Sequence, residues 1–208
     1  MKTKRFAVIL AGCGNKDGAE IHESVLTLFS IDKAGHSYQC FAPDVPQVRV
    51  VNFLTNEVMA QERNVLVESA RIARSQILPL SQYNTADFDG LVLPGGNGVA
   101  YNLCSFAVDG AAGMTVNPDV KQAVVTTHQA SKPVGALCIS PVIIAKLIPG
   151  VTLTFGPGEP VNAAAEDIIV DLKNKVVSTP CYMLSQSRIS QIAQGIDKLI
   201  LKMIALMT

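Results

Sequence analysis

The sequence contains no tryptophan, few aromatic residues, only three histidines and no excess of charge of either sign. Lysines and arginines number 17, as do aspartates and glutamates, so the formal net charge is zero. A neutral chain lacks the basic surface that nucleic-acid binding requires, and we expect no nucleic-acid partner. No apolar run is long enough for a membrane-spanning helix, so we expect no membrane partner either.

Cysteine occurs five times, at positions 13, 40, 104, 138 and 181, and no two have C-x-x-C spacing. An odd number without paired spacing favours a reducing compartment over a disulfide framework or a structural zinc site. The basic N-terminus leads into an apolar run, 6–11, that is too short for a secretory signal. These features predict a cytoplasmic protein without a metal ion.

Strand and helix signals alternate along the chain. Strands are expected at 6–11, 38–42, 48–53, 89–93, 132–138, 151–155, 167–171 and 175–179. Helices are expected at 20–34, at 62–74, twice between 98 and 130, after the strand ending at 138, and at 187–207. This alternation predicts one domain, 1–208, folded as a three-layer α/β/α sandwich around a mostly parallel sheet.

A glycine-rich loop at 12–18 follows the first strand. Its third glycine comes one residue too late for the G-x-G-x-x-G dinucleotide fingerprint, so we expect no nucleotide cofactor and assign no other. The helix that follows should bury Ile21, Val25, Leu28 and Phe29 on its apolar face.

The segment 132–141, Lys-Pro-Val-Gly-Ala-Leu-Cys-Ile-Ser-Pro, runs as a strand to Cys138 and passes at once into a helix. Ser140 is placed to cap that helix, and Pro141 to occupy its first turn. The pattern indicates a nucleophile elbow, although it is not the G-x-S-x-G of the hydrolases. A helix N-terminus beside the thiol should favour the thiolate. The alternative is that Cys138 is a small core residue.

Three loops with site-like residues end three of the expected strands, and such loops meet at one edge of a parallel sheet. In the first, Glu20 and Glu23 are three residues apart and share a helix face. Two neighbouring carboxyl groups, one partly buried, can hold a proton near neutral pH and hydrogen-bond a Cys138 thiolate. The alternative is that both glutamates only complement the helix N-terminus.

The second loop contains Gly95 and Gly96, whose amides can act as an oxyanion hole. None of the three histidines follows Cys138, which excludes a glutaminase or papain-like order with the base downstream of the nucleophile. His22 neighbours Glu23 and is a secondary candidate. Cys13 is a candidate resolving thiol, although a packing role is the simpler interpretation.

Nearly the whole chain resembles the PfpI superfamily, which includes the Parkinson-disease-protein deglycases and class I glutamine-amidotransferase-like domains. It is most similar to the enhancing-lycopene-biosynthesis branch, the ElbB-type glyoxalases. The resemblance rests on the following segments: 12–14, 17–23, 40–44, 63–66, 94–96, 128–130, 132–133, 138–139 and 179–180.

This resemblance implies a flavodoxin-like sandwich, usually dimeric, with Cys138 as nucleophile and Glu23 as general acid and base. His22 would assist, and Gly95, Gly96, the amide of Ile139 and Glu20 would bind the substrate or its oxyanion. The implied activity is a cofactor-independent conversion of small α-oxoaldehydes, such as methylglyoxal, to hydroxy acids.

Two departures distinguish the chain from the pattern that it resembles. Other members carry histidine directly after the nucleophile or further on, where this chain has Ile139 and no later histidine. We therefore expect slow turnover. The segment between Phe155 and Asp167 is also shorter than is usual for the branch that the chain resembles, which affects one wall of the site.

Two other functions remain open. Cys138 could be an oxidisable thiol in a redox-responsive binding protein with little turnover. Alternatively, the chain could be an amidotransferase-like subunit without glutaminase activity.

Overall fold

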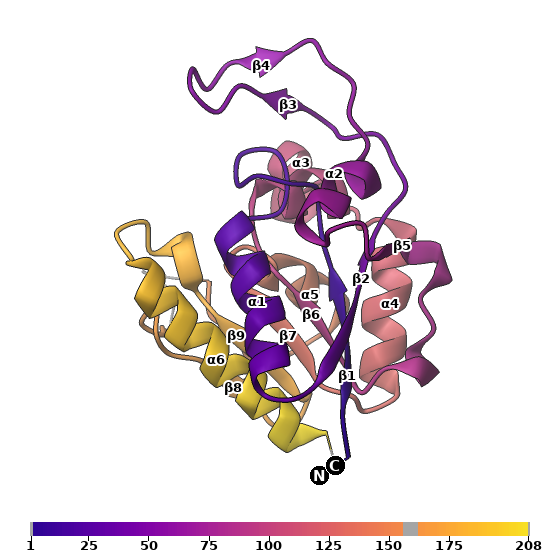
Figure 1. The fold of residues 1–208 in the computed structure, drawn as a ribbon, viewed down its shortest axis with the longest axis vertical. Coiled ribbons are helices and arrows are strands. Elements are labelled where there is room, and N and C mark those ends of the chain that lie inside the picture. The colour runs from indigo at the N-terminus through magenta and orange to yellow at the C-terminus, as the bar shows by residue number, and fades with distance from the viewer. Residues whose placement is uncertain (1, 156–161, 208) are drawn as a thin grey trace.

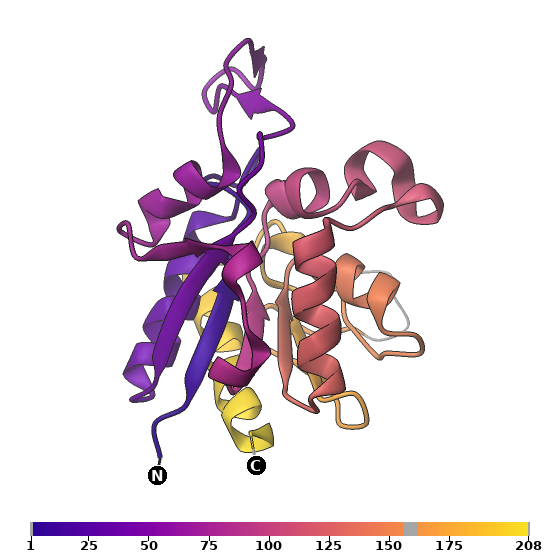
Figure 2. The same ribbon diagram turned by 90° about the vertical axis from the view of Figure 1, so that its right-hand side faces the viewer.

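The computed structural model describes residues 2–155 and 162–207, and shows a seven-stranded sheet between two layers of helices (Figures 1 and 2). The strand order is β5-β2-β1-β6-β7-β9-β8. All neighbouring strands are parallel except β8, which runs antiparallel to β9 at the edge. The predicted three-layer α/β fold is confirmed.

The strands of this sheet are β1 (Arg5–Ile9), β2 (Ser37–Ala42), β5 (Ile77–Pro79), β6 (Gly90–Leu93), β7 (Val134–Leu137), β8 (Ile169–Asp171) and β9 (Val176–Thr179). The central strands β6 and β7 are buried along their whole length, as their continuous apolar sequences predict. The helices are α1 (Ile21–Lys33), α2 (Val65–Ile72), α3 (Phe106–Gly113), α4 (Pro118–Gln129), α5 (Pro141–Leu147) and α6 (Ile189–Leu206).

Helices α1, α2 and α6 cover one face of the sheet, and α4 and α5 cover the other (Figure 2). The short hairpin of β3 (Val50–Val51) and β4 (Val58–Met59) projects beyond the carboxyl ends of the strands (Figure 1). None of the described helices is long and apolar enough to span a membrane.

The sheet reverses its direction of growth between β1 and β6. From β1 the chain proceeds to β2 and β5 on one side, and from β6 to β7 and β9 on the other. Such a switch point leaves a crevice at the carboxyl ends of the two strands, where ligands of α/β proteins bind. The loops after β1, β6 and β7 therefore meet at this end of the sheet.

The prediction for the buried face of α1 was correct for Leu28 and wrong for the other three residues. Ile21, Val25 and Phe29 are 43%, 48% and 55% exposed. Besides Leu28, the inner face carries Ile31, Glu23 and small hydroxyl side chains. A hydroxyl group can be buried there because it bonds back to the helix, as Thr27 does to the carbonyl oxygen of Glu23.

One further expectation fails, two short strands were not predicted, and one expectation falls outside the described residues. Residues 151–155 form no strand. Their amides bond to side chains instead, from Thr152 to Asp171 and from Thr154 to Ser178. Neither β4 nor β5 was predicted, since each has only two or three residues. The expected turn cluster at 156–160 and part of the short segment before Asp167 lie outside the described residues.

Candidate active site

Cys138 lies at the sharp turn between β7 and α5, as the elbow pattern predicts. Its φ angle of +56° is in the left-handed region, which non-glycine residues rarely adopt. The amide of Cys138 donates to the carbonyl oxygen of Thr179 at 2.9 Å, which continues the β7–β9 pairing to this residue. Backbone strain of this kind persists where the surrounding structure enforces it, and it is concentrated at functional sites.

Ser140 is at the N-cap position of α5 but makes no capping hydrogen bond, contrary to the prediction. Its Oγ donates instead to the carbonyl oxygen of Pro94 at 2.7 Å. The elbow after β7 is thereby joined to the glycine turn after β6, and the side chain fixes two parts of the site relative to each other.

Glu23 is fully buried and carries its carboxyl group to Cys138 from the first turn of α1. One oxygen, Oε2, accepts from the amide of Gly95 at 2.9 Å, and Oε1 accepts from the amide of Tyr182 at 3.4 Å. Burial and the nearby Glu20 raise the pKa of Glu23 to about 8, although these amides and a hydrogen bond with Cys138 oppose the rise. Glu23 can therefore hold a proton at neutral pH.

The glycine turn after β6 makes this close approach possible. A Cβ atom on Gly95 would collide with Cys138 and lie 2.6 Å from Oε2 of Glu23. The φ angle of Gly96 is +99°, a conformation that glycine adopts without strain. The prediction that Gly95 offers its amide to a substrate was wrong, because that amide is bonded to Glu23. The amides of Gly96 and Ile139 point at the sulfur of Cys138, where they can stabilise negative charge.

The resting state of Cys138 differs from the prediction. Burial and the adjacent Glu23 raise the pKa of the Cys138 thiol well above its usual value, and the amides of Gly96 and Ile139 only partly oppose this. The prediction of a thiolate assumed that the N-terminus of α5 would be the largest influence on the pKa of Cys138. Removal from water and a neighbouring carboxylate, both of which penalise the thiolate, outweigh that contribution.

Glu20 and His22 surround the pair without touching the sulfur in any described contact. Glu20 caps α1, because its Oε2 accepts from the amide of Glu23 at 2.7 Å. The simpler interpretation of this residue, complementing the helix N-terminus, therefore describes its contacts. His22 is exposed, and its Nδ1 lies 3.0 Å from the hydroxyl of Tyr182. Tyr182 thus lies between the two side chains: its hydroxyl contacts the imidazole of His22, and its amide donates to the carboxyl group of Glu23.

A second thiol near the elbow was missed at the sequence level. Cys181 follows β9, is fully buried and has a φ angle of +46°. Burial raises the pKa of Cys181, and Glu23 and Cys138 add to the rise. The signal was available, because β9 is the neighbour of β7 and its end lies beside the elbow. Cys13, which was the candidate resolving thiol, is influenced by another set of charged groups: Glu68, Arg71, Asp17 and Arg63.

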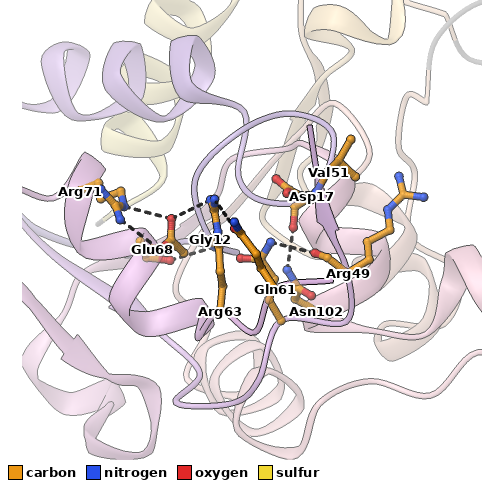
Figure 3. A network of polar contacts seen from close by, with 11 residues as sticks. Gly12, Asp17, Arg49, Val51, Gln61, Arg63, Glu68, Arg71 and Asn102 are labelled. Atoms are coloured by element: carbon orange, nitrogen blue, oxygen red, sulfur yellow. Dashed lines mark hydrogen bonds and ion pairs between the residues drawn. The ribbon is translucent and has the colours of Figure 1, made fainter. Parts of the chain in front are cut away.

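A polar network holds the glycine-rich loop at 12–18 against the rest of the site (Figure 3). The carboxylate of Glu68 lies between Arg71, at 2.9 Å, and Arg63, at 3.5 Å. From the next residue on α2, the Oγ of Ser69 accepts from the amide of Gly12 at 2.9 Å. The Ser69 bond holds the first residue of the loop that precedes α1, and the ion pairs of Glu68 hold the part of α2 that carries Ser69.

Asp17 and Asn102 complete the network from the other side of the loop. The buried carboxylate of Asp17 accepts from the amide of Val51 at 2.8 Å and so attaches the projecting hairpin. The Nδ2 of Asn102 donates to the carbonyl oxygens of Ala11 and Asp17. Three separate segments therefore hold the loop.

Two cavities are lined by residues that neighbour the reacting groups in the chain. One has a volume of about 550 Å³ and a mixed lining, with polar residues that include Glu20, His22 and Tyr182 beside Ile21 and Phe53. The other has about 580 Å³ and begins at Ile139, the residue after the thiol. Within the described residues, no cluster of three or more His, Cys, Asp or Glu is arranged to hold a metal ion.

The arrangement combines a nucleophile, a proton carrier and two amides that can donate hydrogen bonds to an anion. The thiol can attack an electrophilic carbon, the Glu23 carboxyl can accept and return a proton, and the amides of Gly96 and Ile139 can stabilise charge nearby. The predicted residues Cys138, Glu23, Gly95, Gly96 and Ile139 are therefore brought together.

No family model matches the chain, but its curated relatives are clear. It is 40% identical to the ES1 protein homolog, mitochondrial, of Rattus norvegicus over 97% of this chain and 84% of the relative. It is also 40% identical to the glutamine amidotransferase-like class 1 domain-containing protein 3, mitochondrial, of Homo sapiens, over 97% and 83%. The ES1 protein, mitochondrial, of Danio rerio is 30% identical over 86% and 76%. These names correct the expected cytoplasmic location, since they point to mitochondria instead.

Solved structures agree with this relationship. The isoprenoid biosynthesis protein with amidotransferase-like domain from Ehrlichia chaffeensis has a TM-score of 0.92 and 34% identity, covering 99% of this chain and 100% of that one. Drosophila melanogaster DJ-1beta, with a TM-score of 0.53 and 17% identity, covers 99% and 96% and shares the fold. The chain belongs to the ES1 family of glutamine amidotransferase-like class 1 domain proteins.

Proposed function

We propose that the Cys138–Glu23 pair converts α-oxoaldehydes to α-hydroxy acids without a cofactor, as the resemblance to the ElbB-type glyoxalases implies. The observation that carries this proposal is the fully buried carboxyl group of Glu23, whose pKa is raised to about 8 and which hydrogen-bonds the elbow thiol. A carboxyl group that titrates near neutral pH can act both as acid and as base.

In the first step, the sulfur of Cys138 bonds to the aldehyde carbon, and the carbon–oxygen double bond becomes a single bond. The thiol proton passes through Glu23 to the former carbonyl oxygen, which gives a neutral hemithioacetal. The amides of Gly96 and Ile139 stabilise the negative charge that develops during this transfer. A thiol with a raised pKa fits this step, because its proton leaves only as the carbon–sulfur bond forms.

In the second step, ionised Glu23 removes the hydrogen from the former aldehyde carbon and returns a proton to the neighbouring ketone carbon, while the hydroxyl proton of the hemithioacetal passes to the ketone oxygen. The first carbon becomes a thioester carbonyl and the second a secondary alcohol. One carbon is oxidised while the other is reduced, so the step needs no external oxidant. Water then cleaves the thioester, which releases the hydroxy acid and restores the thiol.

The direct test is to incubate the full chain with methylglyoxal in D₂O and to analyse lactate by NMR. We expect lactate in which some molecules retain hydrogen at C2, because one shielded carboxyl group carries the proton between the carbons. Failure to form lactate above the rate without protein would contradict the proposal.

The redox-responsive alternative is less favoured by the site. Peroxide reacts with thiolate rather than with thiol, and burial beside Glu23 raises the pKa of Cys138. Mass spectrometry after mild peroxide treatment distinguishes the two functions. A stable sulfenate or sulfinate on Cys138, in a protein that turns over no aldehyde, would support the redox function instead.

We also propose that the chain forms a homodimer. The exposed apolar stripe on α1, formed by Ile21, Val25 and Phe29, is a surface on which a second copy could pack. Analytical ultracentrifugation of the wild type and of Phe29→Glu tests this. A dimer that the substitution leaves intact would place the interface elsewhere.

A further inference from the structure

The cavity that begins at the elbow is apolar on nearly all sides. It has a volume of about 580 Å³, and every lining side chain except Lys146 is apolar. The principal walls are formed by Phe106, Met114, Ile139, Val142 and Phe155. Met114 and Val142 are buried, whereas Ala111, Ala145, Lys146 and Met183 are exposed. The cavity therefore has a buried floor and an open mouth, and Ala145 and Lys146 of α5 form part of that mouth.

This cavity adjoins both reacting groups. Ile139 lines it, and the amide of the same residue points at the sulfur of Cys138. Met183 lines it from the other side and directly follows Tyr182, whose amide donates to Glu23. Residues that flank the buried Cys138 and Glu23 pair therefore form part of the cavity wall.

The size of the cavity does not suit a three-carbon aldehyde. Cavities of about 300–1,000 Å³ bury ligands of the size of a drug molecule, and the volume here lies within that range. Methylglyoxal would leave most of the apolar wall in contact with water. The other cavity is different, because Asn15, Glu20 and His22 are among its lining residues. The cavity that begins at Ile139 is therefore the more uniformly apolar of the two.

We propose that the substrate is an α-oxoaldehyde with an apolar tail of several carbons, and that this tail occupies the cavity between Ile139 and Lys146. The proposal rests on the proposed function of Cys138 and Glu23, and it adds the substrate class. The tail is selected by removing its methylene groups from water, so specificity depends on chain length rather than on hydrogen bonds.

The test compares kcat/KM for unbranched 2-oxoaldehydes of three to eight carbons. Burial of one methylene group contributes about 0.8 kcal/mol, which corresponds to a rise of about fourfold per carbon. We expect kcat/KM to rise over the first added carbons and to level off when the tail reaches the mouth. A series that is flat, or that falls from methylglyoxal onwards, would overturn the proposal.

A matched pair of variants connects the preference to the cavity. Ala145→Phe places a ring at the exposed mouth, and we expect the ratio of kcat/KM for the eight-carbon and three-carbon substrates to fall at least tenfold. Ala205→Phe makes the same change at an exposed alanine on α6, away from the cavity, and should keep the wild-type ratio. Equal ratios in Ala145→Phe and the wild type would contradict the assignment.

A binding measurement separates this proposal from the proposed function. The fluorescent probe 1-anilinonaphthalene-8-sulfonate is bound to the full chain, and the displacing ligands are 2-octanone and acetone. We expect displacement by 2-octanone at far lower concentration than by acetone, and a weaker difference in Ala145→Phe. If no aldehyde is turned over but this pattern holds, the proposed chemistry fails and the apolar-ligand site stands. Equal potency of the two ketones overturns the site.

Discussion

Two clusters at the carboxyl end of the sheet each combine a cysteine with a buried glutamate, but they differ in the charges nearby. Glu68 lies between Arg63 and Arg71, so its negative charge is compensated within the cluster. Glu23 is buried against Cys138, receives only neutral amides and has the carboxylate of Glu20 nearby. A buried carboxyl group paired with cations stays ionised and holds them in place, whereas one without a cation is protonated near neutral pH.

This difference in nearby charge explains why the Glu68 cluster has a structural role and the Glu23 cluster can take part in a reaction. The ion pairs of the Glu68 cluster hold α2 and the residues before it, and the neighbouring Ser69 bonds to Gly12 in the loop before α1 (Figure 3). The Glu23 cluster places a carboxyl group of variable charge beside a nucleophile. Removing the charge of Glu68 should therefore lower the stability of the fold, whereas removing that of Glu23 should lower the activity.

The largest effect is expected from the thiols. Cys138→Ala should reduce lactate formation from methylglyoxal to the rate without protein, because the carbon–sulfur bond can no longer form. Cys13→Ala removes the thiol of the other cluster and should keep activity within about twofold. Equal losses in both variants, measured on protein with wild-type circular dichroism, would contradict the distinction.

The next effect compares the two glutamates. Glu23→Gln should lower kcat/KM by about 10²–10⁴-fold, the range for loss of a general acid–base group. Glu68→Gln should instead destabilise the fold by about 1–2 kcal/mol, a reduced value because the two arginine side chains are 36% and 66% exposed. Denaturant unfolding and steady-state kinetics on both variants check this. A catalytic loss in Glu68→Gln as large as that in Glu23→Gln would remove the contrast.

The pH dependence of stability gives a third comparison. The pKa of Glu23 is raised from its usual 4.5 to about 8 in the folded state, so the folded state binds more protons than the unfolded state between these values. The stabilisation is complete below about pH 4.5 and is lost as the pH rises through about 8. Relative to Glu23→Gln, the wild type should therefore lose stability from pH 5 to 8.5. A constant difference in denaturation midpoint between the two proteins would contradict the raised pKa.

The smallest effect is expected at the hydrogen bond that joins the two loops of the site. Ser140→Ala removes the bond to the carbonyl oxygen of Pro94 and should cost about 1 kcal/mol of stability. Thermal unfolding measures the change. Wild-type stability of Ser140→Ala would show that the bond does not fix the elbow.

Much of the site could be predicted from the sequence because parallel strands bring their following loops to one edge. Apolar runs before Cys138 and Gly95 identified β7 and β6, and the helix after the first loop identified Glu23. The same topology could have found Cys181, but no site-like motif follows β9 to draw attention to its end.

Other features depend on the tertiary environment. The buried face of α1 could not be found from hydrophobicity, since Thr27 satisfies its hydroxyl within the helix while Phe29 faces outward. The pKa of Cys138 depends on how far burial and Glu23 outweigh the donors on the sulfur, which only the packed structure shows. The extended segment 151–155 bonds to side chains rather than to a strand, which an apolar pattern does not reveal.

The most direct test of the proton-storing pair is the pH dependence of Cys138 alkylation by iodoacetamide, followed by peptide mass spectrometry in the wild type and in Glu23→Gln. We expect an apparent pKa above the value of about 8.5 for free cysteine in the wild type. It should be lower in Glu23→Gln, because the carboxylate that opposes the thiolate is gone. An apparent pKa below 8.5 in the wild type, or one that Glu23→Gln leaves unchanged, would contradict the account.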